Sequence, residues 1–214
     1  MSYATIGIIA GCLAISGYIP YIYSILIGKT RPNRATWFIW TIVGGLLAFS
    51  YIADGDQNSI WLPLGYFLGP LVTAFLSLRY GYAEWTRLDT FCIVAAICSI
   101  IPWVFADSAT MTLLINLAID SIGAIPTLVK TFREPETEDL PAWSVFLVAN
   151  TLQLFAISMW NLTALYPAYL FLLAASMVTF TVRGKLLKRR AVSAQGTGTA
   201  ATNQKKAEKE TEEA

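Results

Sequence analysis

The chain has 214 residues, of which 56% are hydrophobic and 14% are charged, against about 45–50% and about 25% in ordinary soluble domains. It contains no histidine and three cysteines, which excludes a Ser-His catalytic pair and argues against a His or thiolate metal site. The 15 Lys and Arg nearly balance the 14 Asp and Glu, so the positions of the charges carry more information than their sum.

Apolar stretches of about 18 to 24 residues run along the chain with short charged connectors between them, and a helix needs about 20 residues to cross the bilayer core. The predicted fold class is therefore an all-α, polytopic membrane protein with seven transmembrane helices. The predicted spans are residues 4–27, 36–53, 60–78, 88–106, 110–129, 141–160 and 164–182.

The connectors alternate in charge along the chain. All 15 basic residues lie in every second connector or after the last span. Cytoplasmic loops are enriched in Lys and Arg, so this pattern predicts an N-terminus outside and a C-terminus in the cytoplasm, in the cell (inner) membrane. The basic segments are residues 28–35, 79–87, 130–140 and 183–214, and the acids of the other connectors are Asp54, Asp56 and Asp107.

The segment after the last span divides into two parts. Residues 183–190 carry five positive charges at the membrane surface, where they anchor the span next to anionic lipid. Residues 191–214 are rich in Ala, Gly and Thr and then in mixed charges, and they have no aromatic side chain to bury. We expect this part to be a disordered cytoplasmic tail.

The chain also resembles itself at an offset of 106 residues. Residues 17–20 fall on residues 123–126, with Gly-x-Ile-Pro in both, and Trp37 falls on Trp143 without a gap. A three-helix unit ends on the side opposite to its start, so a second unit in the same orientation needs one extra crossing. The predicted organisation is a first repeat at 1–79, a linker helix at 80–108, a second, parallel repeat at 109–186 and the tail at 187–214.

Two three-helix units around a linker helix, each with Gly-x-Ile-Pro near the inner end of its first helix, resemble the SWEET/PQ-loop superfamily of small membrane transporters. The resemblance covers residues 4–186, but the family's Pro-Gln dipeptide is absent, because Pro20 precedes Tyr21 and Pro126 precedes Thr127. It implies transport of sugars, as in SWEET members, or of amino acids with proton coupling, as in some lysosomal members.

The paired prolines are candidate hinges. A proline inside a helix removes one backbone hydrogen bond and kinks the helix. We interpret Pro20 and Pro126, with Gly17 and Gly123 one turn earlier, as hinges that let each unit rock. The alternative is a fixed kink that serves packing.

Asp120, halfway along the fifth predicted span, is the candidate for the centre of the site. A charge at that depth costs at least about 2.5 kcal/mol, so it should face the bundle interior or a wet cavity. Asn116, Gly123 and Thr127 share its helical face, with Gly123 as a gap where a ligand could approach. Three roles stay open: Asp120 binds and releases a proton, accepts hydrogen bonds from the substrate, or bonds polar groups across helices.

The sixth span adds Asn150 and Gln153, whose amides are expected to point inward. Trp143 shares a face with Asn150, and its repeat mate is Trp37. These two indoles either form a wall for the substrate or belong to an interfacial aromatic belt. The weaker pocket candidates are the threonines that the repeat pairs in the third and seventh spans, Thr73 and Thr179.

These features predict a transporter that moves a small polar solute, with a sugar as the preferred cargo, by alternating access between the two units. An amino-acid or nicotinamide-riboside-type carrier and a non-transporting receptor or scaffold are the alternatives. The bundle offers one Asp and no His, so an enzyme is not expected, and no cofactor, metal or nucleic-acid partner is expected either. The expected partners are the substrate, the lipid bilayer, protons if Asp120 couples them, and a second copy of the chain.

Overall fold

The computed structural model describes the backbone of residues 2–53, 61–106 and 108–212, and the side chains of 2–49, 64–106, 108, 110–162 and 164–188. The described residues form helices and connecting loops, without a β-strand, as the composition predicts. The expectations for Asp54, Asp56 and Asp107 lie outside the described residues. In chain order, the helices are α1 (Tyr3–Ser16), α2 (Tyr18–Leu26), α3 (Arg34–Ala53), α4 (Trp61–Tyr80), α5 (Arg87–Val104), α6 (Ala109–Arg133), η1 (Pro135–Thr137), α7 (Leu140–Phe155), η2 (Leu162–Ala164) and α8 (Leu165–Glu212).

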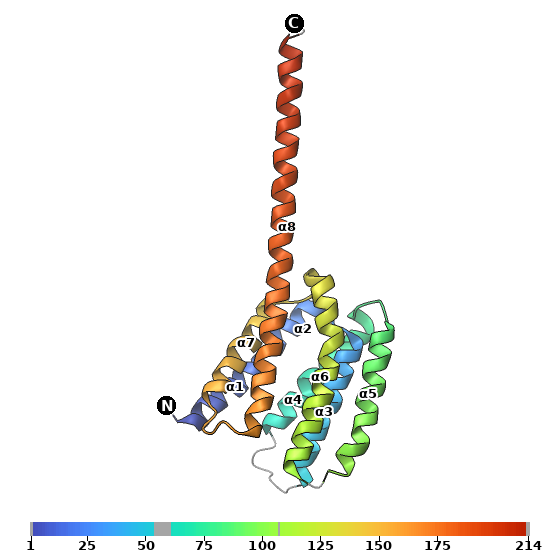
Figure 1. Cartoon of the computed structure of the whole chain (residues 1–214), viewed down its shortest axis with the longest axis vertical. Helices are drawn as coiled ribbons and strands as arrows, with labels where there is room; N and C mark the ends of the chain where they lie inside the picture. Colours follow the sequence, from blue (N-terminus) through green and yellow to red (C-terminus); the bar gives the residue numbers. More distant parts are fainter. Residues whose placement is uncertain (1, 54–60, 107, 213–214) are drawn as a thin grey trace.

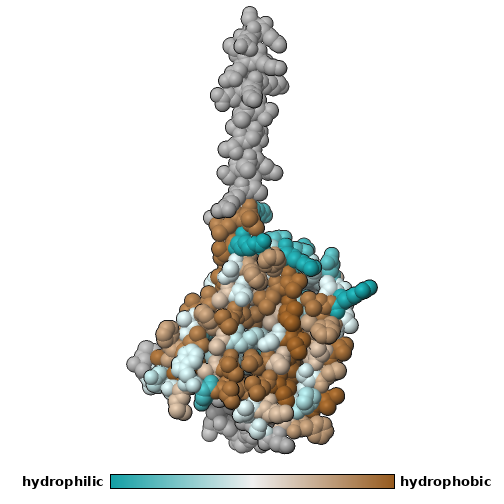
Figure 2. All heavy atoms as spheres, in the orientation of Figure 1, coloured by the Kyte–Doolittle hydropathy of each residue, from teal (hydrophilic) through white to brown (hydrophobic). Residues whose placement is uncertain are grey.

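Four helical stretches are long and apolar enough to cross a membrane: Tyr3–Leu26, Arg87–Val104, Thr110–Arg133 and Leu165–Lys188. Two shorter apolar stretches, Arg34–Phe49 and Leu140–Phe155, belong to α3 and α7. Large apolar side chains lie exposed on the outside of the bundle, and Figure 2 shows hydrophobic residues over most of the visible side, with hydrophilic ones gathered near the end from which α8 projects. Exposed apolar surface on this scale is compatible with a membrane protein.

In each half of the chain, the helices pack on one another (Figure 1). In the first half of the chain, α4 contacts α1, α2 and α3, and in the second half α8 contacts α6 and α7. The two halves meet where α1 packs on α7 and where α3 packs on α6. Helix α5 packs on α6 and α3 from outside, and Figure 1 shows it at the edge opposite α1 and α7.

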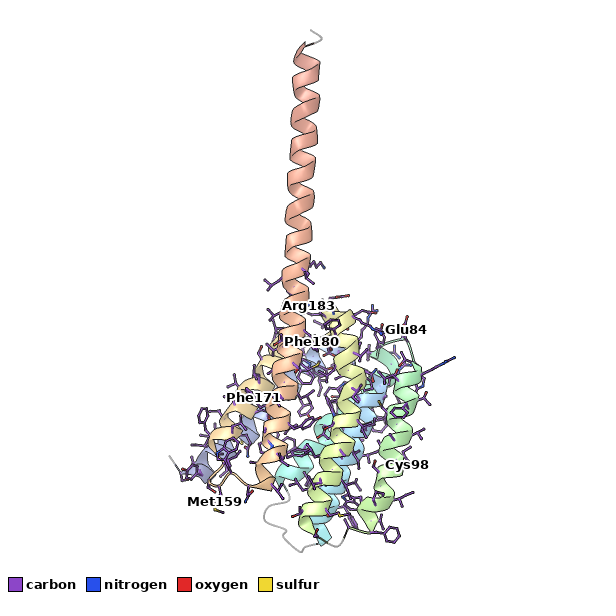
Figure 3. All side chains as sticks on the ribbon, viewed as in Figure 1. Glu84, Cys98, Met159, Phe171, Phe180 and Arg183 are labelled. Carbon is purple, nitrogen blue, oxygen red and sulfur yellow. The ribbon has the colours of Figure 1, made fainter. Side chains whose placement is uncertain are left out.

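The last helix ties its half together near the end from which it leaves the bundle. The rings of Phe180 in α8 and Phe132 in α6 lie with centroids 5.3 Å apart. One turn further along α8, the Arg183 guanidinium lies 4.3 Å from the centroid of Phe132. Figure 3 shows Phe180 and Arg183 on successive turns of α8 beside α6, so a cation–π contact joins the two helices there.

The first predicted span corresponds to one apolar stretch, Tyr3–Leu26, whereas two other helix boundaries differ from the sequence-based predictions. Between α1 and α2, Gly17 keeps a right-handed helical backbone (φ −61°, ψ −23°), and its amide donates to the Leu13 carbonyl at 3.1 Å. Pro20 has no amide hydrogen to donate to Ser16, which loosens the helix locally without ending the span. Helix α7 ends at Phe155, whereas the predicted span continues to residue 160. The prediction is too long because hydropathy shows which residues are apolar and does not show where the helical backbone ends.

Helix α8 continues to Glu212, whereas a disordered tail was predicted for 187–214. The physical reason lies in propensity: Ala, Lys, Gln and Glu, which dominate the end of the chain, are among the best helix formers. Their lack of apolar side chains, on which the prediction of disorder rested, does not oppose helical backbone.

Helices α3 and α4 approach each other at backbone distance beside Gly44. A Cβ atom at Gly44 would lie 2.8 Å from the Tyr66 carbonyl oxygen and 2.9 Å from the Phe67 Cα. Backbone atoms cannot rotate away, so any side chain at this position must push the two helices apart. The neighbouring Gly45 differs, because its Cβ would meet only the Phe67 ring at 3.5 Å, an ordinary contact.

Gly44→Ala is therefore expected to lower the free energy of unfolding by about 1–3 kcal/mol, the usual cost of overpacking. Gly45→Ala is the matched control, since alanine is favoured over glycine in a helix by roughly 0.5–1 kcal/mol and has space here. Thermal unfolding of both variants in detergent measures the difference. Equal stability of the two variants would contradict the close approach of α3 and α4.

The basic residues of the connectors lie in the loop 28–33 and on the helix ends that flank this loop and the loops 81–86 and 134–139. These three loops meet at one end of the bundle, which we call the basic end. The Arg31 amide donates to the Thr137 carbonyl at 2.9 Å, and the Tyr82 amide donates to the Pro32 carbonyl at 2.9 Å. The Lys29 ammonium lies 3.6 Å from the Asp139 carboxylate. The alternation of charge along the sequence thus corresponds to one physical end of the structure.

Candidate functional site

A cavity of about 370 Å³ lies between the two halves of the bundle, within the usual range for small-molecule sites. Its lining runs from the first turns of α3 and α7, at Trp37 and Trp143, to the last turn of α7 and the first turn of α8, so it extends toward the end opposite the basic end. Its described lining residues are Gly11, Ala14, Tyr18, Trp37, Trp40, Val43, Gly44, Leu47, Tyr66, Pro70, Asp120, Trp143, Phe146, Asn150, Gln153, Tyr166, Pro167, Leu170, Leu173 and Ala174.

Asp120 of α6 lies on the wall of this cavity and is 5% exposed. Both carboxylate oxygens accept hydrogen bonds from α8: Oδ2 from the Tyr166 hydroxyl and Oδ1 from the Tyr169 hydroxyl, the latter at 3.2 Å. The Trp40 indole of α3 donates to the backbone carbonyl of Asp120 at 3.3 Å. Asp120 therefore connects α6 with α8 and α3 while it faces the cavity.

Five aromatic side chains, which we call the aromatic cluster, form a closed ring of contacts at the wall of the cavity. Successive ring centroids lie 6.2, 5.0, 6.4, 5.5 and 5.2 Å apart, so that the last ring returns to the first. The contacts are edge-on, an arrangement that aromatic pairs prefer. In the order of these contacts, the members are Tyr18, Trp37, Trp40, Trp143 and Phe146.

A hydrogen-bonded group closes the bundle between the aromatic cluster and the basic end. Glu138 accepts from the Tyr21 hydroxyl at 3.1 Å, from the Trp143 indole at 2.9 Å and from the Lys130 ammonium at 2.5 Å. Lys130 also donates to the Arg31 carbonyl at 2.6 Å. We call Tyr21, Lys130, Glu138 and Trp143 the buried latch; it joins α2, α6, α7 and the loop before α3.

The latch corrects one interpretation of the sequence. The sequence predicts that Lys130 lies in the connector 130–140, but α6 continues to Arg133 and Lys130 is only 4% exposed. Asp120 is also not the one buried acid of the predicted spans, since Asp89 in the first turn of α5 is 2% exposed. Asn33 donates to Asp89 at 2.8 Å, and the Thr86 backbone amide donates to it at 2.7 Å, which satisfies this carboxylate locally.

The predicted site residues divide into two groups. The structure brings five of them to the cavity: Trp37, Asp120, Trp143, Asn150 and Gln153. The other four lie elsewhere, namely Thr73, Asn116, Thr127 and Thr179.

Each of the four has a distinct place. Thr73 is buried and donates to the Gly69 carbonyl at 2.9 Å. Thr179 is on the exposed side of α8 and donates to the Ala175 carbonyl at 2.7 Å. Asn116 Oδ1 and Thr127 Oγ1 are buried, without a hydrogen-bond partner among the described residues, and neither residue lines the cavity. Asn116 and Thr127 share a helical face with Asp120, but this spacing does not place them in the cavity, because Asp120 is the one described residue of α6 that lines it.

The glycines proposed as hinges allow close packing between the halves of the chain. A Cβ at Gly17 would lie 2.7 Å from the Phe146 ring, and one at Gly123 would lie 2.6 Å from Ile39. The space at Gly123 is thus filled by α3 rather than open to a ligand. The backbone stays helical at both prolines: Pro20 lies within α2, three residues after Gly17, and Pro126 lies within α6.

Sequence reasoning missed the tyrosines of the site. Tyr166 and Tyr169 bind Asp120, while Tyr18 and Tyr66 line the cavity. Their spacing offered a signal, since Tyr166 and Tyr169 are three residues apart and therefore share one helical face. An interfacial position near the start of the last span explains such tyrosines equally well from sequence alone.

A smaller hollow of about 120 Å³ lies at the basic end, beside Asn33, Asp89 and Lys130. At its edge the Tyr82 hydroxyl donates to Glu134, and this hydrogen bond is the main cause that raises the pKa of Tyr82 to about 12. Tyr82 therefore stays a neutral donor over the physiological range. Asp89 and Lys130, which also line the hollow, are hydrogen-bonded within the protein.

No family model, curated protein or solved structure matches this chain. Among the described residues there is also no group of three or more His, Cys, Asp or Glu side chains that could hold a metal ion. The function therefore has to be argued from the geometry of the cavity.

Proposed function

We propose that the chain is a seven-span membrane transporter that moves a small organic solute by alternating access between two three-helix repeats, α1–α4 and α6–α8, with α5 as the linker. The observation that carries this proposal is the cavity between the halves, which reaches toward one end of the bundle and is closed toward the other by the aromatic cluster and the buried latch. The resemblance to the SWEET/PQ-loop superfamily remains part of this proposal.

Matched packing between the halves supports the repeat. At the contact of α1 and α2 with α7, Gly17 accommodates Phe146 of α7. At the contact of α3 with α6, Gly123 accommodates Ile39, with Trp40 3.4 Å from the added Cβ. Gly17 and Gly123 are 106 residues apart, as are Trp40 and Phe146, so the two interfaces use equivalent positions.

The N-termini of α3 and α7, which lie at the basic end, also support the internal repeat. The Asn33 side chain accepts from the Thr36 amide at 3.0 Å before α3, and the Asp139 side chain accepts from the Ala142 amide at 2.8 Å before α7. Both the caps and the amides they bind are again 106 residues apart. Such N-caps fix where a helix begins, so the second helix of each unit starts at an equivalent position.

The proposed orientation places the basic end in the cytoplasm, because Lys and Arg are enriched in cytoplasmic loops. The N-terminus then lies outside and α8 leads into the cytoplasm. In this orientation the structure represents a state whose cavity extends outward and whose cytoplasmic side is closed. Transport requires the latch to open so that the cavity reaches the other side.

Uptake into proteoliposomes, with and without a pH gradient, tests the proposal. With a panel of glucose, glycine and choline, we expect concentration-dependent uptake of at least one solute. Asp120→Asn is expected to reduce that uptake at least about tenfold at every pH, since a charged hydrogen-bonding group facing the substrate is lost. Glu136→Gln, which changes an exposed carboxylate of η1, is the control.

Other outcomes distinguish the alternatives. Uptake by Asp120→Asn that is intact but no longer responds to a pH gradient would assign proton coupling to Asp120. Binding of a solute without flux would favour a receptor or scaffold and overturn the transporter.

A further inference from the structure

The charge inside the cavity is unbalanced. Asp120 is the one carboxylate among the described lining residues, and none of those residues is Lys or Arg. The partners of Asp120 are neutral hydroxyl groups, and both of its oxygens act as acceptors, which is the hydrogen-bonding pattern of the ionised form. A buried carboxylate without a cationic partner is costly, so a cationic ligand would complete the site.

The walls around this carboxylate are rich in aromatic faces. Beyond the aromatic cluster, Tyr66 of α4 and Tyr166 of α8 line the same cavity as Asp120. The face of an aromatic ring carries partial negative charge and attracts a cation, most strongly for Trp, and such cages hold quaternary ammonium groups. The Trp40 indole bonded to the Asp120 backbone at 3.3 Å ties one wall directly to the acid.

A sugar fits these walls less well. Each buried sugar hydroxyl needs a hydrogen-bond partner, but several polar groups of the cavity already have one. The Tyr166 hydroxyl donates to Asp120, and the Asn150 amide donates to the Leu170 carbonyl at 3.2 Å. An anionic ligand would meet repulsion from Asp120.

We infer that the substrate of this cavity is a small monovalent organic cation, a quaternary ammonium or a flat aromatic cation, held by Asp120 and by the aromatic walls. This inference names the substrate class of the proposed transport site and rests on that proposed function. It replaces the sugar that the resemblance alone favours. Asp120 supplies the counter-charge, and Trp40 and its aromatic neighbours supply the faces.

Calorimetric titration of the purified full-length chain tests the inference with probes that differ in charge. Choline and N-methylpyridinium are the cations, 3,3-dimethyl-1-butanol is a neutral molecule with the shape of choline, and glucose represents sugars. Choline or N-methylpyridinium is expected to bind at least about tenfold more tightly than the neutral alcohol, the effect of a desolvated cation–π and ionic contact.

Matched variants separate the contribution of the charge from that of the aromatic face. Asp120→Asn is expected to lower the affinity for the cation about tenfold, toward that of the neutral alcohol, whereas Glu136→Gln leaves it unchanged. Trp40→Phe retains an aromatic face and should bind more tightly than Trp40→Leu. Circular dichroism establishes that each variant is folded.

The binding and uptake experiments can contradict the substrate class and the transport function separately. The inference is overturned if neither cation binds. It is also overturned if glucose or the neutral alcohol binds more tightly than both cations. Cation affinity that is unchanged in Asp120→Asn overturns it too. Cation binding without uptake leaves the inference standing and overturns the proposed transport function instead.

Discussion

Glu138→Ala is expected to lower the free energy of unfolding by about 3–5 kcal/mol, the cost of leaving a buried charge without its partner. Glu138 is 2% exposed and accepts three hydrogen bonds in the buried latch. Its removal leaves the Lys130 ammonium, 4% exposed, with the Arg31 carbonyl as its remaining described acceptor. Denaturant unfolding in mixed micelles measures the loss.

A double substitution and an exposed carboxylate provide the controls. Lys130→Met combined with Glu138→Leu removes both charges, and it is expected to be more stable than Glu138→Ala alone, because no unpaired charge stays buried. Glu136→Ala, two residues away and exposed, should change stability by no more than about 0.5 kcal/mol. Equal losses in Glu138→Ala and Glu136→Ala would show that the latch contributes nothing to stability.

The parts of the fold that follow from local composition could be predicted from the sequence. Apolar runs predict helices at nearly their observed places, because a continuous apolar surface has to be buried or face lipid. Basic connectors were assigned to one side, and the contacts of Arg31 with Thr137 and of Tyr82 with Pro32 bring these loops together. Asp120 was identified because a charge within an apolar run needs a polar environment.

The parts that depend on contacts between distant residues could not be predicted. The sequence places Lys130 in a connector, and it does not show that Lys130, Tyr21 and Trp143 all donate to Glu138. The sequence predicts open space beside Gly123, but the Ile39 side chain fills it. Helical spacing gives the direction of a side chain relative to its own helix, whereas a cavity depends on what the opposing helix presents.

Two roles of the buried latch are in tension. It stabilises the structure by joining both halves at the basic end, yet alternating access requires these halves to separate there. The latch can open if each of its contacts is individually modest, or if other contacts replace them in the second conformation. The loop contact between Arg31 and Thr137, with N and O 2.9 Å apart, is the point where separation can be blocked without touching the cavity.

A disulfide between Arg31→Cys and Thr137→Cys is therefore expected to abolish uptake and to leave binding of the solute from the opposite end unchanged. A backbone contact of this kind brings the two Cα atoms close to the spacing that a disulfide spans. The native cysteines Cys12, Cys92 and Cys98 are first replaced by alanine. Uptake into proteoliposomes is measured before and after addition of a reductant.

The controls decide whether the closed basic end is one state of a transport cycle. Each single-cysteine variant should transport as the parent does, and reduction should restore uptake in the double variant. A cross-linked protein that transports at the parental rate would show that the loops 28–33 and 134–139 stay together throughout the cycle. In that case the route of the solute would have to leave the bundle elsewhere, and the latch would be a purely structural contact.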